Sequence, residues 1–282
     1  MRLLQTRALK LFQFYGDFIP SYAILSHTWG LEEVTFQDMQ NGKAASKTGY
    51  EKIQSCCDQA VEDGFQYCWI DTCCIDKTSS SELSEAINSM FSWYAKAERC
   101  YVHLSDLPPE LSESDVLEEL PDCRWFTRGW NLQELLAPKE ITSIHEDALT
   151  GDYPNIEGYS VAQRLSWASE RQTTRIKDMA YSLMGIFKVH MPLLYGEGWR
   201  AFERLQEEII KISDDDSIFT WRDARSDADD TWTSLLPPAP SYFGGCSSIA
   251  APAANYMIPR DDSGDDVAHA GGATRWRCHD AT

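Results

Sequence analysis

The chain has 282 residues, 43% of them hydrophobic, which is enough for one large domain or for one domain with a smaller companion. Its formal net charge of −19 argues against non-specific binding to nucleic acid or to an anionic membrane, because like charges repel. Nine cysteines, an odd number that includes two adjacent pairs, favour free thiols over a disulfide framework. No segment is apolar for long enough to span a bilayer, and the N-terminus lacks the pattern of a signal peptide. We therefore expect a cytoplasmic protein.

The first half of the chain alternates predicted strands and helices. Residues 9–14 form a weak edge strand, and residues 22–26 form the first convincing buried strand. A helix over residues 48–63 is followed by a strand over 67–71, an order that favours a right-handed crossover and a parallel sheet. The next helix begins at one of the serines 79–81, and its apolar stripe consists of Leu83, Ile87, Met90, Tyr94 and Ala97. A third strand covers residues 100–104.

The second half is predicted to be mainly helical. After a helix over 125–136 and a short strand over 140–144, further helices cover 161–169, 175–187 and 199–212. The last 33 residues show no periodic pattern, and we expect them to be disordered or loosely packed. The sequence therefore predicts three regions: an α/β domain over residues 1–145, a helical extension over 146–221 and an acidic, poorly ordered region over 222–282.

Two similar segments end buried strands with polar, small or aromatic residues. They are YAILSHTWG, residues 22–30, and WIDTCCIDK, residues 69–77. The carboxyl edge of a parallel sheet is where α/β proteins usually keep their sites, so these residues are candidates for substrate binding. The candidates are Ser26, His27, Trp29, Gly30 and Asp71.

Each of these candidates also has a structural interpretation. Ser26 and His27 are adjacent in a strand and point to opposite faces, so they do not form a catalytic dyad. His27 titrates near neutrality and suits a phosphate or substrate, or it is a hydrogen-bonded structural histidine. Trp29 either stacks on a base or packs in the core. Asp71, at the end of its strand, either orients a ligand hydroxyl or caps a turn.

Glu82 is the candidate catalytic residue. At 100° per residue it lies about 100° from Leu83 at the centre of the apolar stripe, whereas Glu85 lies about 160° away and points to solvent. Glu82 therefore flanks the buried face near the start of its helix. A carboxylate in that position either stabilises the helix dipole or stabilises positive charge while a glycosidic bond breaks.

Trp130 and Glu134 are one helical turn apart and share a face. With Arg128 they form either an aromatic anchor with an ion pair or the rim of the same pocket, and we include both residues among the substrate-binding candidates. No Cys-x-x-Cys or His-x-x-x-His spacing supports a metal site.

Several separated blocks resemble the fungal heterokaryon incompatibility (HET) domain. The two segments above resemble its "YAILSHTWG" and "WIDTCCIDK" hallmarks, and WFTRGWNLQEL, residues 125–135, resembles its "WF.RGW.LQEL" block. The resemblance covers roughly residues 22–134. Residues 171–198 resemble the extension common in these fungal proteins, and the likeness ends near residue 250.

The resemblance implies a role in fungal non-self recognition, in which activated HET domains trigger cell death, a form of innate immunity. HET domains are distantly similar to TIR domains, so it implies a central, mostly parallel sheet of flavodoxin or TIR type with a helical C-terminal extension. Some TIR domains hydrolyse NAD, and Glu82 occupies the region of their glutamate. NAD is then a substrate, and no cofactor is expected. Protein partners of a cell-death pathway and self-association are also implied. The alternatives are a non-enzymatic interaction module in the same pathway and an inactive fragment.

Overall fold

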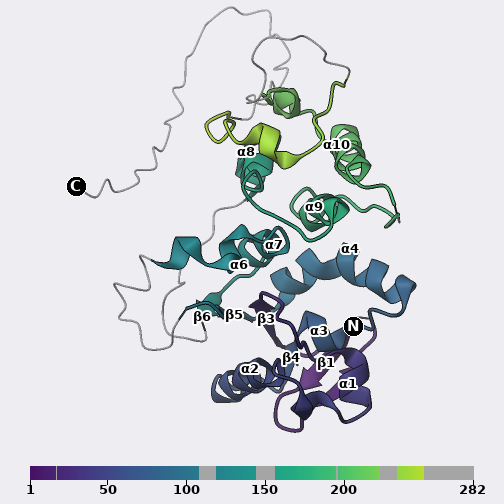
Figure 1. Ribbon diagram of the computed structural model, residues 1–282, viewed down its shortest axis with the longest axis vertical. Coiled ribbons are helices and arrows are strands. Elements are labelled where there is room, and N and C mark those ends of the chain that lie inside the picture. Colours follow the sequence, from purple (N-terminus) through teal and green to yellow (C-terminus); the bar gives the residue numbers. More distant parts are fainter. Residues whose placement is uncertain (17, 108–118, 144–155, 195, 223–233, 251–282) are drawn as a thin grey trace, which may run out of the picture. The chain divides into compact units, whose positions relative to one another are not determined.

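A six-stranded sheet organises the N-terminal half of the protein. The computed structural model describes residues 1–16, 18–107, 119–143, 156–194, 196–222 and 234–250. Within these residues the strand order is β2-β1-β4-β3-β5-β6 (Figure 1). The strands are β1 (Arg2–Gln5), β2 (Lys10–Gln13), β3 (Ala23–His27), β4 (Tyr67–Trp69), β5 (Arg99–His103) and β6 (Ile141–Ser143).

The four strands β4, β3, β5 and β6 are parallel, while β1 and β2 extend the sheet in antiparallel pairing. The predicted α/β class with a mostly parallel sheet is therefore confirmed. If β3, β4, β5 and β6 are numbered 1 to 4 along the chain, their order across the sheet is 2-1-3-4. A flavodoxin-like sheet begins in this way. Strand β1 was not predicted, because Leu3 and Leu4 are both buried and no alternation marks this short strand.

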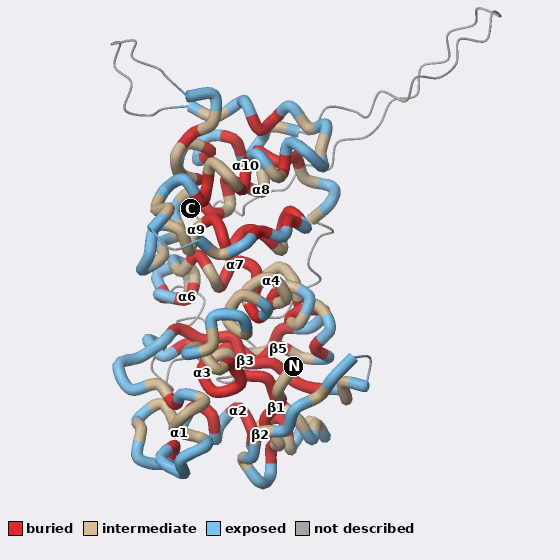
Figure 2. The backbone as a smooth tube through the Cα atoms, turned by 90° about the vertical axis from the view of Figure 1, so that its right-hand side faces the viewer, coloured by how far each residue is buried: buried red, intermediate tan, exposed pale blue. Residues whose placement is uncertain are grey.

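Helices cover both faces of the sheet. Helix α2 (Tyr50–Glu62) lies on one face, and α4 (Ser80–Lys96) and α7 (Trp130–Leu136) lie on the other (Figures 1 and 2). Helix α4 begins as expected at the serine run, where the Ser79 hydroxyl accepts a hydrogen bond from the Glu82 N–H at 3.4 Å. In the apolar stripe of α4, Met90, Tyr94 and the C-cap residue Ala97 are buried.

The structure corrects two details of the sequence analysis. The helix expected over 125–136 is divided into α6 (Arg124–Thr127) and α7, because the backbone of Arg128 forms a parallel β-bridge with Gln172. Asp71 does not end a strand: β4 stops at Trp69, and Asp71 is the first residue of α3 (Asp71–Cys74). A carboxylate at the start of a helix interacts favourably with the helix dipole.

The helical extension has a second hydrophobic core. It contains α8 (Val161–Ser166), α9 (Ile176–Leu183) and α10 (Arg200–Ile212), which lie where helices were expected. Residues 234–250 belong to the region predicted to be poorly ordered, yet η5 (Pro240–Phe243) contacts α8, and Phe243 is fully buried in this core. Residues 251–282 lie outside the described part.

The remaining short helices are α1 (Phe36–Gln40), η1 (Ala44–Ser46), η2 (Leu120–Asp122), η3 (Ile156–Gly158) and η4 (Asp216–Phe219).

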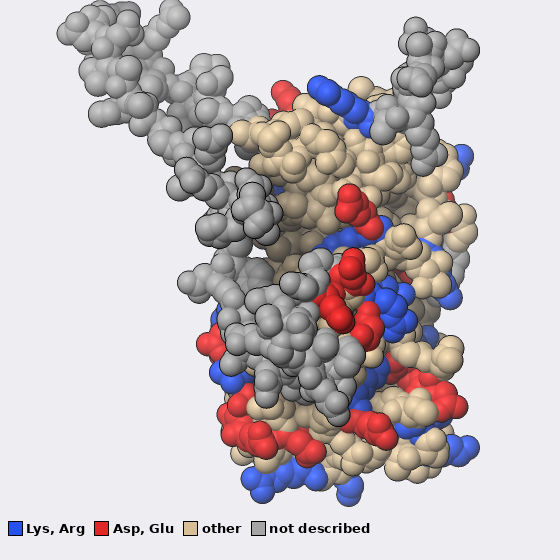
Figure 3. Space-filling view, turned by 60° about the vertical axis from the view of Figure 1, so that its left-hand side comes forward, with Lys and Arg blue, Asp and Glu red and all other residues tan. Residues whose placement is uncertain are grey.

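The thiols agree with the expectation of free cysteines, and charged side chains of both signs lie on the surface. On the face shown in Figure 3, acidic and basic side chains lie side by side over the sheet-containing half. All eight cysteines in the described ranges are free and buried. Among the helices whose placement is described, none is both long and apolar enough to cross a membrane.

Candidate functional site

Ser26 and Glu134 meet in the buried layer between β3 and α7. The Ser26 hydroxyl donates a hydrogen bond of 2.5 Å to Glu134 Oε2 and accepts one of 2.7 Å from Trp125 Nε1. Ser26 is 0% exposed and Glu134 is 8% exposed. Burial raises the pKa of Glu134 to about 8, and the nearby Asp71 charge adds to the rise. The Glu134 carboxyl is therefore mostly protonated at neutral pH, and it connects the sheet to the helical layer.

The ion pair considered for Glu134 and Arg128 is not found among the described residues, because the Glu134 carboxyl is engaged by Ser26 instead. Trp130, one turn earlier on α7, is partly buried and packs against both hydrophobic cores. Its position matches the aromatic anchor of the structural interpretation. Trp125 belongs to the WFTRGW block noted in the sequence. The sequence could not show that the Trp125 indole would reach Ser26.

His27 points to the opposite face of β3, as the strand geometry predicts. Its side chain is 1% exposed, and its Nε2 lies 3.6 Å from Asp71 Oδ1. Neither ring nitrogen has a hydrogen-bond partner in the described part of the chain. Burial lowers the pKa of His27 to about 4, although the Asp71 charge opposes this shift. His27 is therefore neutral at physiological pH in this arrangement.

Asp71 connects His27 to two residues at the surface. Its Oδ2 accepts a hydrogen bond of 2.9 Å from Trp29 Nε1 and lies 3.6 Å from Lys77 Nζ. Burial alone would raise the pKa of Asp71, but the Lys77 charge and the Trp29 hydrogen bond lower it below its usual value. Lys77 Nζ also lies 3.4 Å from the centre of the Trp29 ring system, a cation–π contact. Trp29 remains 45% exposed, so the core-packing interpretation does not apply to it.

Gly30 extends the same edge. Its N–H donates a hydrogen bond to Glu33 Oε1, and that carboxylate forms an ion pair with Lys52 of α2. Five of the predicted residues, Ser26, His27, Trp29, Gly30 and Asp71, are thus gathered at the carboxyl edge of β3 and β4. The cations Lys52 and Lys77 were missed, because isolated lysines carry no pattern that assigns them to a site.

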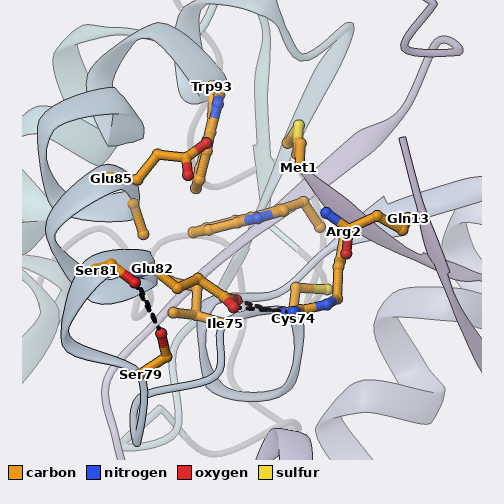
Figure 4. A pocket seen from close by; sticks show the side chains of 12 residues that line it. Met1, Arg2, Gln13, Cys74, Ile75, Ser79, Ser81, Glu82, Glu85 and Trp93 are labelled. Atoms are coloured by element: carbon orange, nitrogen blue, oxygen red, sulfur yellow. Dashed lines mark hydrogen bonds and ion pairs between the residues drawn. The ribbon is translucent and has the colours of Figure 1, made fainter. Parts of the chain in front are cut away.

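Glu82 lines a separate pocket of about 210 Å³ between β1 and α4 (Figure 4). Its carboxylate is held by the Arg2 guanidinium through two hydrogen bonds, one of which is 2.8 Å long, and it also accepts the Asp76 N–H at 2.8 Å. Trp69 and Trp93 line the same pocket. The partners found for Glu82 within the described ranges therefore lie outside the Ser26–Asp71 edge, and Glu82 does not join it.

Glu85 lines this pocket as well, but it is exposed, as its helical position predicts. In Figure 4, Glu82 and Arg2 reach toward each other, whereas Glu85 extends beside Trp93. Arg2 could not be anticipated, since β1 was not recognised. No group of three or more metal-ligating side chains is found in the described part of the molecule.

Comparison with known proteins gives three results. A family model described as "Heterokaryon incompatibility protein (HET)" matches residues 22–114, and one described as "Domain of unknown function (DUF8212)" matches residues 200–254. The chain is 48% identical over 221 residues to "Vegetative incompatibility protein HET-E-1" of Podospora anserina, an alignment that covers 68% of this chain and 16% of that protein. The chain thus spans much less than two thirds of that relative. No solved structure matches it.

Proposed function

Since this fungal chain contains a heterokaryon incompatibility domain, we propose that it acts in non-self recognition as a module that starts a cell-death response. The observation that carries the proposal is the 48% identity to a vegetative incompatibility protein over 221 residues. The family match also includes β3, β4 and β5, the strands that build the edge described above. In this proposal the part of the module that functions is this sheet edge with its covering helices.

Inducible expression of the chain in a filamentous fungus tests this proposal. We expect growth arrest and uptake of a vital dye after induction. A Trp125→Ala variant should lose the effect, because it removes a fully buried indole and its hydrogen bond to Ser26. Ser55→Ala, at an exposed position of α2, is the matched control and should remain toxic. Normal growth with folded wild-type chain accumulating in the cells would contradict the proposal.

The second candidate function is hydrolysis of NAD at the nicotinamide–ribose bond, with Glu82 as the key carboxylate. The observation that favours it is a carboxylate in a pocket lined by two indoles, which suits a flat cationic ring. In this reaction the bond between the ribose C1′ and the nicotinamide nitrogen breaks, nicotinamide leaves as a neutral molecule, and water adds to C1′ with release of a proton. Glu82 would stabilise the oxocarbenium-like transition state.

This reaction requires Glu82 to separate from Arg2. Substrate pockets usually measure about 300–1,000 Å³, so the pocket of about 210 Å³ would hold the nicotinamide end of NAD only. The enzymatic form of the protein would therefore be one in which β1 shifts or Arg2 turns away. Arg2→Gln frees the carboxylate and should raise the rate of nicotinamide release.

Chromatographic measurement of nicotinamide release from NAD by the purified chain tests this second candidate. Glu82→Gln should abolish release, and Glu51→Gln, the same change at an exposed position of α2 outside the pocket, should leave it unchanged. Loss of activity in both Arg2→Gln and Glu82→Gln would mean that the ion pair, and not the carboxylate, is required. No release by the wild type, including at concentrations that favour self-association, would exclude the activity.

The proposed setting is the cytoplasm, with protein partners of a cell-death pathway and self-association of the chain. The same variants separate enzymatic from non-enzymatic action. If Glu82→Gln remains as toxic in the fungus as the wild type, the module acts through its surface and not through NAD hydrolysis.

A further inference from the structure

Another pocket, of about 220 Å³, lies beside the carboxyl end of β3. Its lining consists of two arginines, Arg124 and Arg128, together with four threonines, Gln172 and Trp29. We propose that this pocket binds the phosphate group of a mononucleotide. The proposal concerns binding and does not depend on the functions proposed above.

The charge of the lining favours an anion. The chain carries a net charge of −19, yet no Asp or Glu lines this pocket, and both charged residues in it are arginines. Within the described ranges, neither guanidinium lies within ion-pair distance of a carboxylate. Arg124 Nη2 is oriented by Thr28 Oγ1 and Ser105 Oγ, each at 3.3 Å. Guanidinium, hydroxyl and amide groups are the donors that bind phosphate oxygens.

The pocket also lies at the position in the sheet where a ligand is expected. Thr28 follows β3 directly, and Ser105 comes two residues after β5. In the order 2-1-3-4, β3 and β5 are the first and third strands, so the chain leaves them in opposite directions across the sheet. Open α/β sheets bind their ligands outside the carboxyl ends of the strands at such a switch point.

The wall opposite the sheet comes from the helical extension and is firmly attached. The Gln172 N–H donates to the Thr127 carbonyl at 2.6 Å, and the Gly129 N–H donates to the Gln172 carbonyl at 2.8 Å. Arg171 Nη1 donates to the Arg128 carbonyl at 2.9 Å. These bonds bring Gln172 and the two following threonines, Thr173 and Thr174, against α6. The pocket is therefore formed in the folded protein, and the extension completes it.

Trp29 indicates that the phosphate belongs to a nucleotide. The pocket is smaller than the roughly 300 Å³ at which small-molecule sites begin, so it accommodates a phosphate and its sugar but not a base. Trp29 lines the pocket and remains 45% exposed, with its N–H fixed by Asp71 at 2.9 Å. A base attached to the bound sugar can stack on this oriented indole.

Isothermal titration of the full chain with AMP, adenosine and inorganic phosphate tests the proposal. We expect AMP to bind, phosphate to bind more weakly and adenosine not to bind. Arg128→Gln and Arg124→Gln should each weaken AMP binding by about tenfold or more, since each removes a charge-assisted contact. Trp29→Ala should weaken binding of AMP but not of phosphate. Arg7→Gln removes an exposed arginine beyond β1 and serves as the control with unchanged affinity.

Three results would overturn the proposal. The first is no heat of binding and no thermal stabilisation with millimolar AMP. The second is wild-type affinity for AMP in both arginine variants. The third is equal affinity for AMP and inorganic phosphate, which would exclude the nucleotide assignment. Arg124 is exposed, so Arg124→Gln should fold normally even if Arg128→Gln does not, and circular dichroism checks this.

Discussion

The Ser26 hydroxyl donates a 2.5 Å hydrogen bond to the carboxyl of Glu134, which is 108 residues further along the chain. This contact joins the central strand of the sheet to the helix that leads into the extension. It lies in a buried layer together with the Trp125 indole, which donates to the same hydroxyl. A single small side chain therefore satisfies two polar groups that solvent does not reach.

Ser26→Ala should lower the free energy of unfolding by roughly 2–4 kcal/mol, because Trp125 Nε1 loses its acceptor and Glu134 loses its donor in a buried layer. Urea denaturation followed by tryptophan fluorescence measures this change. Ser55→Ala, at an exposed position of α2, should change stability by less than about 0.5 kcal/mol. Equal effects of the two substitutions would show that the Ser26 contact does not stabilise the fold.

Glu134→Gln should remove a specific pH dependence of stability. The pKa of Glu134 in the folded protein, about 8, lies above its ordinary value of 4.5, so the folded state binds the proton more tightly. The resulting stabilisation is complete below pH 4.5 and is lost as the pH rises through 8. Melting temperatures between pH 5 and 9 should fall less in the Glu134→Gln variant than in the wild type. A parallel decline in both proteins would contradict the raised pKa.

His27→Gln should remove a pH dependence of stability that has the opposite sign, a loss of stability at acidic pH. Burial lowers the pKa of His27 from 6.5 to about 4, so the unfolded state binds the proton more tightly. The stabilisation is present above pH 6.5 and is lost as the pH falls through 4, by up to about 3 kcal/mol. The groups facing His27 are Asp71, Lys52, Glu33 and Lys77, and all remain in the variant. Unfolding curves at pH 4, 5 and 7 should diverge, with the wild type losing more stability on acidification.

Gly185→Ala should destabilise the packing of the extension against α4. A Cβ at position 185 would lie 2.1 Å from the Cβ of Phe91, so one of the two segments must move. We expect a loss of about 1–3 kcal/mol from overpacking, measurable by urea denaturation. Gly158→Ala is the matched control, since nothing lies within 4 Å of a Cβ at that position. If both variants unfold at the same urea concentration, the close approach to Phe91 does not limit stability.

Most elements of the fold were predictable because their signals are local. Apolar runs predict the buried strands over 22–26 and 100–104. A period of 3.6 residues predicts the apolar stripe that ends at Tyr94 and Ala97. The failures also have local causes. Strand β1 is four residues long and buries two successive leucines, and α6 and α7 are separated at Arg128 by a partner, Gln172, from another part of the chain.

The candidate site was predictable only in part. Five candidates do gather at the carboxyl edge of β3 and β4, since parallel strands bring their ends together. The roles of individual residues depend on partners that arrive from elsewhere. Glu82 is held by Arg2, 80 positions away, and burial keeps His27 neutral and Glu134 mostly protonated at neutral pH.

The sequence by itself determined the family, the α/β class and the residues that stand at the sheet edge, because motifs and periodicity are properties of short segments. Only the tertiary structure decided which charges are paired, which polar groups are buried and that Arg124 and Arg128 line one pocket. The physical reason is that desolvation and ion pairing depend on distances across the folded molecule, and no pattern of neighbouring residues encodes those distances.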